Sequence, residues 1–207
     1  LSLGNAWDDY GGARALVGLA RLAAPRPNDA RAFVHPAVRA LRRDFVRQLL
    51  SHRSRIDGHV IGTHPAVLAW EPMNEPRAAR HGLDADGRAM RAWLDAEAGT
   101  IALHAPGKTI TSGEDGVDAS LEGRDAAFWR SVGANHLFAH ATSFRRNAAS
   151  PHVTWPSVHV YPEAWGVPPA LRTTAAERFV RESAAIARGA GKRLFVGEVG
   201  ATDGDRW

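Results

Sequence analysis

The sequence predicts an α/β fold with a parallel sheet, in the form of a partial (β/α) barrel. Two observations lead to this prediction. Short apolar segments that suit buried strands alternate along the chain with longer segments whose apolar residues recur at helical spacing. A polar, loop-like cluster follows each apolar segment. Because a barrel carries its chemistry at the C-terminal ends of its strands, these clusters are where we expect a functional site.

Five segments have the length and composition of buried strands, and each is bounded by polar or turn-forming residues. A barrel of eight βα units usually takes about 250 residues. Five units in 207 residues therefore indicate long loops and missing units. In chain order, the predicted strands are residues 1–5, 67–70, 108–111, 157–161 and 193–196.

Four segments between these strands are predicted to be helical. Pro36 suits the first turn of the first segment, because the N–H that proline lacks would have no helical partner there. Thr174 and Glu177 have the spacing of a capping box at the start of the last segment, and Gly189 can end it. The predicted helices are residues 36–53, 86–104 and 174–188 throughout, and residues 126–146 in part.

The composition excludes several classes of protein. The apolar fraction of 44% and the charged fraction of 23% are ordinary for a globular domain. The chain has no Cys, which excludes a disulfide scaffold and a thiolate metal site. No apolar run approaches the roughly 18 residues of a membrane span. The 26 basic residues form no dense run, which argues against nucleic acid. We expect a monomer with neither a membrane nor a nucleic-acid partner.

Two glutamates stand at the ends of predicted strands, where side chains converge on the mouth of a barrel. Glu75 lies in the segment WEPMNEP (residues 70–76), and Glu198 lies in GEVG (residues 197–200). They are about three βα units apart, so they can face each other across the mouth. Glycoside hydrolysis needs two carboxyl groups, about 5 Å apart in retaining enzymes. Asn74 supplies an amide for a sugar hydroxyl. The alternative is that each glutamate is a solvated loop carboxylate.

Five motifs in the same order resemble glycoside hydrolase family 5, and its β-mannanase branch in particular. WEPMNEPR (residues 70–77) is similar to a WELANEPR-type motif, and NAWDDYGG (residues 5–12) to an NNWDDYGG-type segment. SGEDG (residues 112–116) and HVYPEAWG (residues 159–166) mirror TGEEG-type and HxYPDxWG-type segments, and the sequence around Glu198 matches the nucleophile segment. The departures are Ala6, Pro72 and Met73, and the resemblance runs from Leu1 to about Thr202.

The resemblance implies a partial (β/α)8 TIM barrel, roughly strands 3 to 7 with their helices. It implies that Glu75 is the acid/base and Glu198 the nucleophile of a retaining hydrolase. Such an enzyme cleaves internal β-1,4-mannosidic bonds in mannan, galactomannan or glucomannan. Two carboxyl groups this close cannot both ionise cheaply, so we expect a raised pKa and a protonated form for Glu75, the acid.

The resemblance also sets expectations for the rest of the protein. The family pattern has two strands before this chain's first strand and one after its last. We therefore expect residues 1–207 to be a single catalytic domain that is a fragment of a longer protein. Family members need no cofactor, and we expect none here. Because mannan is polymeric, we expect an extracellular, secreted protein.

His159 and Tyr161 alternate along a predicted strand, so both point to one face. If that face is the barrel mouth, Tyr161 donates a hydrogen bond to Glu198 and His159 orders the carboxylate network. Both would then lie where a sugar binds. The alternative is a strand His and a strand Tyr in a polar core.

Four further residues are candidate sugar contacts. Trp7 and Trp165 lie in predicted loops, where indole rings can stack on sugar faces. The alternative is that they are buried hydrophobes that anchor the loops. Arg77 and Glu114 can reach hydroxyls in neighbouring subsites, or pair with surface charges.

Other functions remain open. A β-glucanase or cellulase of the same family carries the same two glutamates, and only the loop motifs favour mannan. A non-catalytic carbohydrate-binding remnant would also keep these residues. His136 and His140 have a metal-ligand spacing of i, i+4, but no glutamate motif accompanies them, so we expect no metal site.

Overall fold

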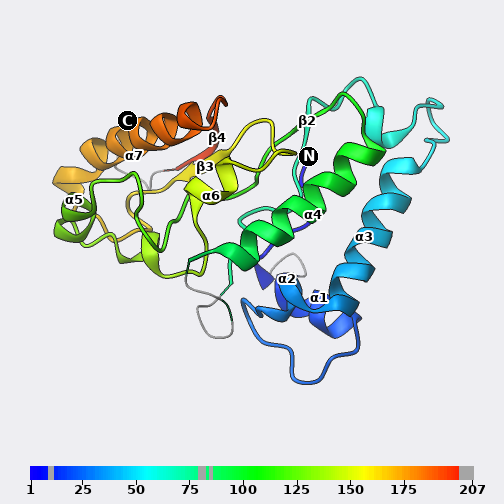
Figure 1. Ribbon diagram of the computed structural model, residues 1–207, viewed down its shortest axis with the longest axis horizontal. Coiled ribbons are helices and arrows are strands. Elements are labelled where there is room, and N and C mark those ends of the chain that lie inside the picture. The colour runs from blue at the N-terminus through cyan, green and yellow to red at the C-terminus, as the bar shows by residue number, and fades with distance from the viewer. Residues whose placement is uncertain (9–11, 79–82, 84–85, 201–207) are drawn as a thin grey trace.

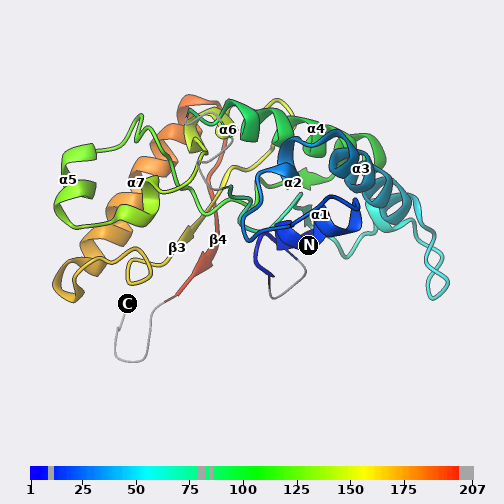
Figure 2. The same ribbon diagram turned by 90° about the horizontal axis from the view of Figure 1, so that it is seen from below.

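The computed structural model describes residues 1–8, 12–78, 83 and 86–200. Helices and strands alternate through this part of the chain, as predicted (Figure 1). Figure 2 shows β3 and β4 between α5 and α7 on one side and α1 to α4 on the other. The strands are β1 (Ala69–Trp70), β2 (Thr109–Ile110), β3 (Ser157–Val160) and β4 (Phe195–Val199). The α-helices are α1 (Gly12–Leu19), α2 (Arg31–Val34), α3 (Pro36–Ser51), α4 (Arg88–His104), α5 (Ala126–Ser131), α6 (Phe144–Ala148) and α7 (Arg172–Gly189); the 3₁₀ turns include η2 (Ile61–Thr63), η3 (Asn135–Phe138) and η4 (Pro169–Leu171).

The strands pair in parallel and in chain order. Residues 1–5 form parallel bridges with the segment at and after β1, at Ser2 to Glu71 and Asn5 to Asn74. β1 pairs with β2, a parallel bridge joins Thr111 to Trp155 just before β3, and β3 pairs with β4. Neighbouring strands that are consecutive in sequence, parallel and separated by helices have the arrangement of a (β/α) barrel. The predicted order of five strand segments is therefore confirmed.

Helix boundaries differ from the prediction in one informative place. α3 begins at Pro36, and the His35 ring accepts a hydrogen bond from the Ala37 N–H as an N-cap. α7 begins at Arg172, two residues before the predicted capping box. The turn η4 leads directly into it, because Pro169 already has the backbone angle of a helical turn. The capping box at Thr174 is therefore wrong. Among the described residues, no helix combines the length and apolar character that crossing a membrane requires.

The apolar core has two parts. One gathers the inward faces of α2, α3 and α4, and the other gathers those of α5, α6 and α7 against β3. The largest side chains of the first part include Phe33 and Trp93, whose rings meet edge to face at 5.1 Å. Trp129 and Phe179 meet similarly in the second part, at 5.8 Å. The strand ends lie between these two anchored parts.

A buried ion pair connects the helices to the strand ends. Arg42 on α3 donates to a Glu97 carboxylate oxygen on α4 at 2.8 Å, and each side chain is less than a tenth exposed. The same guanidinium donates to the carbonyl oxygens of Leu3 and Pro72, at 3.0 and 2.7 Å. Arg42 therefore fixes the two backbone segments that precede Asn5 and Asn74.

Candidate active site

Glu75 stands on a loop that is hydrogen-bonded to two neighbouring segments. The Asn74 N–H donates to the carbonyl oxygen of Gly4 at 2.9 Å, and the Glu75 N–H donates to that of Gly113 at 2.7 Å. Glu75 has a φ of 47°, a left-handed conformation that strains a residue with a side chain. Gly113 has a φ of 71°, and a Cβ there would collide with the carbonyl oxygen of Met73. The backbone thus holds Glu75 in one unusual orientation.

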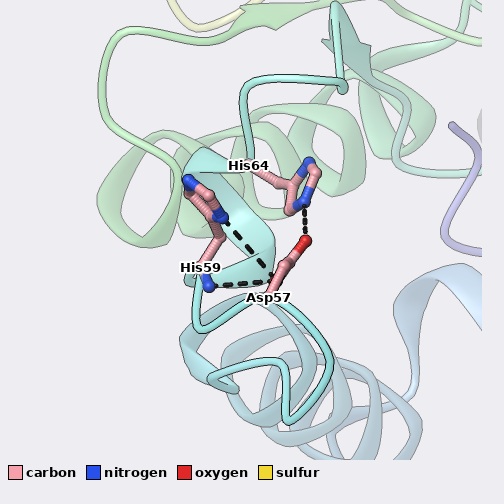
Figure 3. Close-up of side chains that lie close together, drawn as sticks. All are labelled: Asp57, His59 and His64. Atoms are coloured by element: carbon pink, nitrogen blue, oxygen red, sulfur yellow. Dashed lines mark hydrogen bonds and ion pairs between the residues drawn. The ribbon is translucent and has the colours of Figure 1, made fainter.

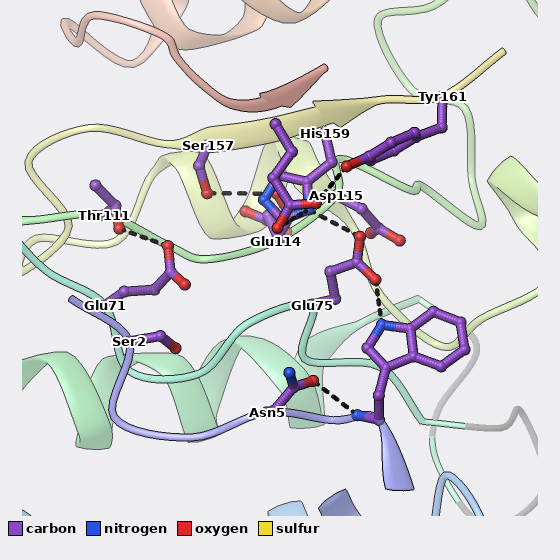
Figure 4. Close-up of polar contacts among 12 residues, drawn as sticks. Ser2, Asn5, Glu71, Glu75, Thr111, Glu114, Asp115, Ser157, His159 and Tyr161 are labelled. Carbon is purple, nitrogen blue, oxygen red and sulfur yellow. Dashed lines mark hydrogen bonds and ion pairs between the residues drawn. The ribbon is translucent and has the colours of Figure 1, made fainter. Parts of the chain in front are cut away.

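The Glu75 carboxylate is buried and accepts hydrogen bonds on both oxygens. Nδ1 of His159 lies 2.8 Å from Oε1, and Nε1 of Trp7 donates to Oε2 at 2.5 Å. Arg77 also donates to Oε2. Figure 4 shows Glu75 reaching up toward His159 from the opposite side of the cleft.

Glu198 lies opposite Glu75, with His159 beside both. His159 on β3 and Glu198 on β4 are register partners, so the two side chains lie next to each other across the strands. Nδ1 of His159 is 3.5 Å from a carboxylate oxygen of Glu198, and Oη of Tyr161 donates to the other oxygen at 2.8 Å. A carboxylate oxygen of Glu75 and one of Glu198 lie within 4.8 Å of each other. The predicted hydrogen bond from Tyr161 is therefore present.

The charges of this cluster are coupled through His159. Burial lowers the pKa of His159, but the hydrogen bond to Glu75 and the charges of both glutamates outweigh burial, so its pKa is raised. Burial and the Glu198 carboxylate raise the pKa of Tyr161 to about 12, which keeps its hydroxyl a donor.

The pKa of Glu75 differs from the expectation. Burial raises it, but the hydrogen bond from His159 and the positive charge of Arg77 outweigh burial, and the pKa is lowered. The prediction of a raised pKa for Glu75 is therefore wrong. The two shifts together favour a charged Glu75 carboxylate beside a protonated His159 ring.

Arg77 is held by a further acidic residue that sequence reasoning did not single out. A guanidinium nitrogen of Arg77 lies 3.2 Å from Oδ2 of Asp115, and its Cζ is stacked 4.3 Å from the centre of the Trp7 ring. Nε2 of His136 lies 3.8 Å from the same Asp115 oxygen. Burial raises the pKa of Asp115, but His136 and Arg77 lower it to about 2. Asp115 therefore stays charged and holds Arg77 beside Glu75.

These side chains surround a cleft of about 420 Å³. It is lined by Trp7, Asn74, Glu75, Arg77, Asp115, His136, His159, Tyr161, Ala164, Trp165 and Glu198. Every predicted site residue except Glu114 lines this cleft. Residues Asp9–Gly11 of the NAWDDYGG segment lie outside the described residues.

The family relationship agrees with this geometry. Residues 26–203 match the family described as "GH family 5 beta-mannosidase-like", a match that includes both Glu75 and Glu198. The chain belongs to glycoside hydrolase family 5. The resemblance inferred from the motifs is thereby confirmed.

Two curated family 5 relatives come from rice, Oryza sativa subsp. japonica. Mannan endo-1,4-beta-mannosidase 8 is 28% identical over 167 residues, which cover 80% of this chain and 43% of the rice protein. Mannan endo-1,4-beta-mannosidase 1 is 29% identical over 167 residues, which cover 80% of this chain and 37% of that protein. The chain therefore spans less than half the length of these relatives.

Solved structures of family 5 proteins show the same fold. The endo-beta-1,4-mannanase from Thermotoga petrophila superposes with a TM-score of 0.84 at 22% identity, over 96% of this chain and 41% of that one. The endo-1,4-beta-mannanase from Rhizomucor miehei superposes with a TM-score of 0.80 at 18% identity, over 98% of this chain and 54% of that one. The fold is thus part of a (β/α)8 TIM barrel, as predicted.

Two predicted sugar contacts have a different environment from the one expected of a family 5 subsite residue. Glu114 is buried, accepts a hydrogen bond from Asn147 at 2.8 Å and does not line the cleft, so its predicted contact with sugar hydroxyls is wrong. Burial raises the pKa of Glu114 to about 8. Trp165 is 4% exposed and packs 4.6 Å from Phe179, so it borders the cleft as a core residue rather than as a free stacking surface. Trp7, in contrast, is 48% exposed.

A metal ion is a poor match for the cluster in the cleft. Glu75, His159 and Glu198 each offer one ligand atom within 4.8 Å of the others. A histidine ligand must be neutral to bind a metal. The raised pKa of His159 and its hydrogen bond to Glu75 favour the protonated ring instead. His136 and His140, on and beside η3, meet edge to face at 5.3 Å between ring centres, and His136 faces the Asp115 carboxylate.

Proposed function

We propose that this chain carries the catalytic site of a retaining glycoside hydrolase that cleaves internal β-1,4-mannosidic bonds in mannan, galactomannan or glucomannan. The observation that carries the proposal is the approach of the Glu75 and Glu198 carboxylates to within 4.8 Å, oxygen to oxygen. Retaining glycosidases place their carboxyl groups about 5–5.5 Å apart, whereas inverting enzymes need about 6.5–9.5 Å to admit a water. The names of the rice relatives support mannan as the substrate.

In the first step, Glu75 donates a proton to the glycosidic oxygen while Glu198 attacks the anomeric carbon. The bond to the leaving sugar breaks, an ester bond to Glu198 forms, and the leaving sugar departs with the proton as a new hydroxyl. Glu198 is suited to attack, because its side chain is 37% exposed to the cleft and Tyr161 fixes one of its oxygens.

In the second step, the Glu75 carboxylate takes a proton from water. The water oxygen attacks the anomeric carbon, the ester bond breaks and Glu198 returns to a carboxylate. Two inversions give net retention. His159 contacts both carboxylates, so its N–H remains close to the negative charge as that charge moves between them.

Glu75 has to gain a proton before the first step. Trp7 and Arg77 both donate to Oε2 of Glu75, and these hydrogen bonds favour its charged form. A sugar in the cleft excludes water and places a glycosidic oxygen at Oε2. We infer that substrate binding displaces at least the indole N–H of Trp7 from Oε2. This change raises the pKa of Glu75 and allows it to act as an acid.

The first experiment is hydrolysis by the full chain. We expect the chain to release reducing ends from galactomannan and glucomannan, and few from carboxymethylcellulose. If cleavage is internal, the viscosity of a mannan solution should also fall quickly. Proton NMR of the first product should show the β-anomer. An α-anomer first would contradict the retaining mechanism, and preference for carboxymethylcellulose would favour the β-glucanase alternative.

Substitution separates the enzyme from a binding module. Glu198→Gln and Glu75→Gln should each lose hydrolysis but still bind mannohexaose. The control is Glu122→Gln, at an exposed glutamate paired with Arg145, which should keep full hydrolysis. The alternative is a non-catalytic carbohydrate-binding module. Mannohexaose binding without hydrolysis by the unaltered chain would support that alternative. We further propose that the protein acts outside the cell, because its substrate is polymeric.

A further inference from the structure

A loop outside the cleft brings together one aspartate and two histidines. It leads from the end of α3 through η2 to His64, and its backbone is internally hydrogen-bonded. The Ser54 N–H donates to the carbonyl oxygen of His59 at 2.8 Å, and the Gly58 N–H donates to that of Ser54 at 3.0 Å. An antiparallel bridge joins Arg53 to Val60. The side chains on this loop therefore start from a fixed backbone.

Asp57, His59 and His64 point toward one another (Figure 3). Oδ2 of Asp57 lies 2.6 Å from Nε2 of His64, and Oδ1 lies 3.6 Å from Nδ1 of His59. The two rings are 5.1 Å apart, centre to centre. Each residue offers one ligand atom, and these atoms all lie within 4.8 Å of one another.

The geometry and chemistry of this cluster suit a transition metal. Zn²⁺ binds imidazole nitrogen and carboxylate oxygen at about 2.0–2.2 Å, so its ligand atoms lie roughly 3.3 Å apart in a tetrahedron. The side chains of His59, Asp57 and His64 are 53%, 40% and 22% exposed, which leaves them room to turn by the small amount that this spacing requires. Their exposure also leaves the fourth position to water.

We propose that Asp57, His59 and His64 form a surface site for Zn²⁺ or a similar divalent transition metal, with water as the fourth ligand. The site stands apart from the hydrolase proposal, because none of its residues lines the cleft.

The ionisation of the ligands is compatible with metal binding. Hydrogen bonds from His64 and from the His59 N–H lower the pKa of Asp57, so it is a carboxylate at neutral pH. The Ala66 N–H donates to Nδ1 of His64 at 3.1 Å, which places the ring proton on Nε2. Metal binding at Nε2 moves this proton to Nδ1, so the hydrogen bond from the Ala66 N–H breaks, and water at this exposed residue replaces it.

Two nearby cations reduce the affinity without occupying the ligand atoms. Arg53 donates to the carbonyl oxygen of Gly58. Lys108 donates to the carbonyl oxygen of His64 at 2.7 Å. Both point to backbone oxygens rather than to the Asp57 carboxylate.

A metal here would fasten the end of α3 to the start of β1. Nε1 of the Trp70 indole donates to the carbonyl oxygen of Gly62 at 2.8 Å, so η2 already connects to β1 through this contact. A bound ion would add a link between the loop before η2 and His64 directly after it. Its effect is therefore stabilisation of the fold, which grows with metal concentration.

The experiment is calorimetric titration of the chelator-treated full chain with ZnCl₂ alone, near pH 7.5. We expect binding that weakens at least tenfold in His59→Ala, His64→Ala and Asp57→Asn, and a melting temperature that rises with zinc in the unaltered chain. His152→Ala, at an exposed histidine outside the cluster, should bind as the unaltered chain does. Circular dichroism verifies that each variant is folded.

A second variant distinguishes the two clusters that offer ligand atoms among the described residues. If zinc were instead bound in the cleft by Glu75, His159 and Glu198, then Glu198→Gln would lose zinc binding and His64→Ala would keep it. We expect the opposite: Glu198→Gln keeps zinc binding and His64→Ala loses it. CoCl₂ gives an independent readout, because tetrahedral Co²⁺ absorbs strongly in the visible range and that absorption should vanish in His64→Ala. Equal zinc binding by the unaltered chain and all three loop variants, or no binding by the unaltered chain, overturns the proposal.

Discussion

His159 and Glu198 occupy partner positions on the parallel strands β3 and β4, directly after a register shift between Val158 and His159. Side chains at partner positions of neighbouring strands project from the same face of a sheet. The pairing therefore places the imidazole next to one carboxylate, while the loop after β1 brings Glu75 to the same nitrogen. One ring contacts both glutamates, at 2.8 and 3.5 Å.

Tyr161→Phe should lower kcat without weakening substrate binding. The variant removes the hydroxyl that donates to Glu198 at 2.8 Å and keeps the ring. A hydrogen bond to a charged group contributes about 1.5–3 kcal/mol, so we expect kcat to fall roughly 10- to 150-fold. Steady-state kinetics on mannohexaose measures kcat, and calorimetry on the Glu198→Gln background measures binding. An unchanged kcat would mean that Tyr161 does not orient the nucleophile.

His159→Ala should change the pH profile as well as the rate. His159 holds the pKa of Glu75 down, so its removal should move the limb of the kcat/KM profile that belongs to Glu75 to higher pH. The raised pKa of His159 has a consequence for stability too. The protonated ring stabilises the fold fully below about pH 6.5 and loses this effect as pH rises through the folded pKa. His152→Ala is the control, and an unshifted limb would contradict the assignment.

Trp7→Phe should also move the limb of the kcat/KM profile that belongs to Glu75 to higher pH, by less than His159→Ala does. Phenylalanine keeps an aromatic face for Arg77 but lacks the N–H that donates to Oε2 of Glu75 at 2.5 Å. The charged form of Glu75 thereby loses one donor, and its pKa rises. A pH profile measured beside that of His159→Ala tests the order of the two shifts. A larger shift in Trp7→Phe would indicate that the indole, rather than the imidazole, controls the ionisation of Glu75.

Much of the site could be predicted because its residues follow strands. Glu75, Glu198 and Tyr161 each lie at or after a strand end, and parallel strands in chain order bring those ends together. Side-chain direction in the turns could not be predicted this way. Glu114 and Asp115 are adjacent after β2, yet Glu114 is buried against Asn147 while Asp115 lines the cleft. A shift of one residue along the turn decides which carboxylate lines the cleft.

Properties that depend on partners far apart along the chain could not be predicted from the sequence either. The lowered pKa of Glu75 depends on His159, 84 residues away, and on the direction of Arg77. Trp165 lies in a loop, where exposure is the ordinary expectation, but Trp129 and Phe179 pack against it. The pair of Arg42 and Glu97 lies on two helices whose polar residues are mostly solvated, so periodicity gives no reason to bury it.

Arg42→Ala should destabilise the fold strongly. The change leaves the Glu97 carboxylate buried without its cation and removes the donors to the Leu3 and Pro72 carbonyl oxygens. Breaking a buried pair in this way costs about 3–5 kcal/mol. Urea unfolding measures the loss, and Arg47→Ala, at an exposed ion pair with Asp44, should cost less than about 1 kcal/mol. Equal losses in the two variants would show that burial does not matter here.

Glu114→Gln should make the protein more stable at alkaline pH. The pKa of Glu114 is about 8 in the fold against an ordinary value of 4.5, so between these values the folded protein holds a proton that the unfolded chain has released. Stability therefore falls as pH rises across this window, by at most about 1.4 kcal/mol per pH unit. Glutamine is neutral and keeps an oxygen that accepts the hydrogen bond from the side-chain amide of Asn147.

The difference in stability between Glu114→Gln and the unaltered chain isolates the effect of the ionisation of Glu114. We expect equal urea midpoints near pH 5 and a higher midpoint for the variant near pH 8. Glu122→Gln, at an exposed glutamate, should show no such divergence. If the midpoints of Glu114→Gln and the unaltered chain changed in parallel from pH 5 to pH 8, Glu114 would have to be ionised in the fold. A charge partner would then have to lie closer to it than Asn147.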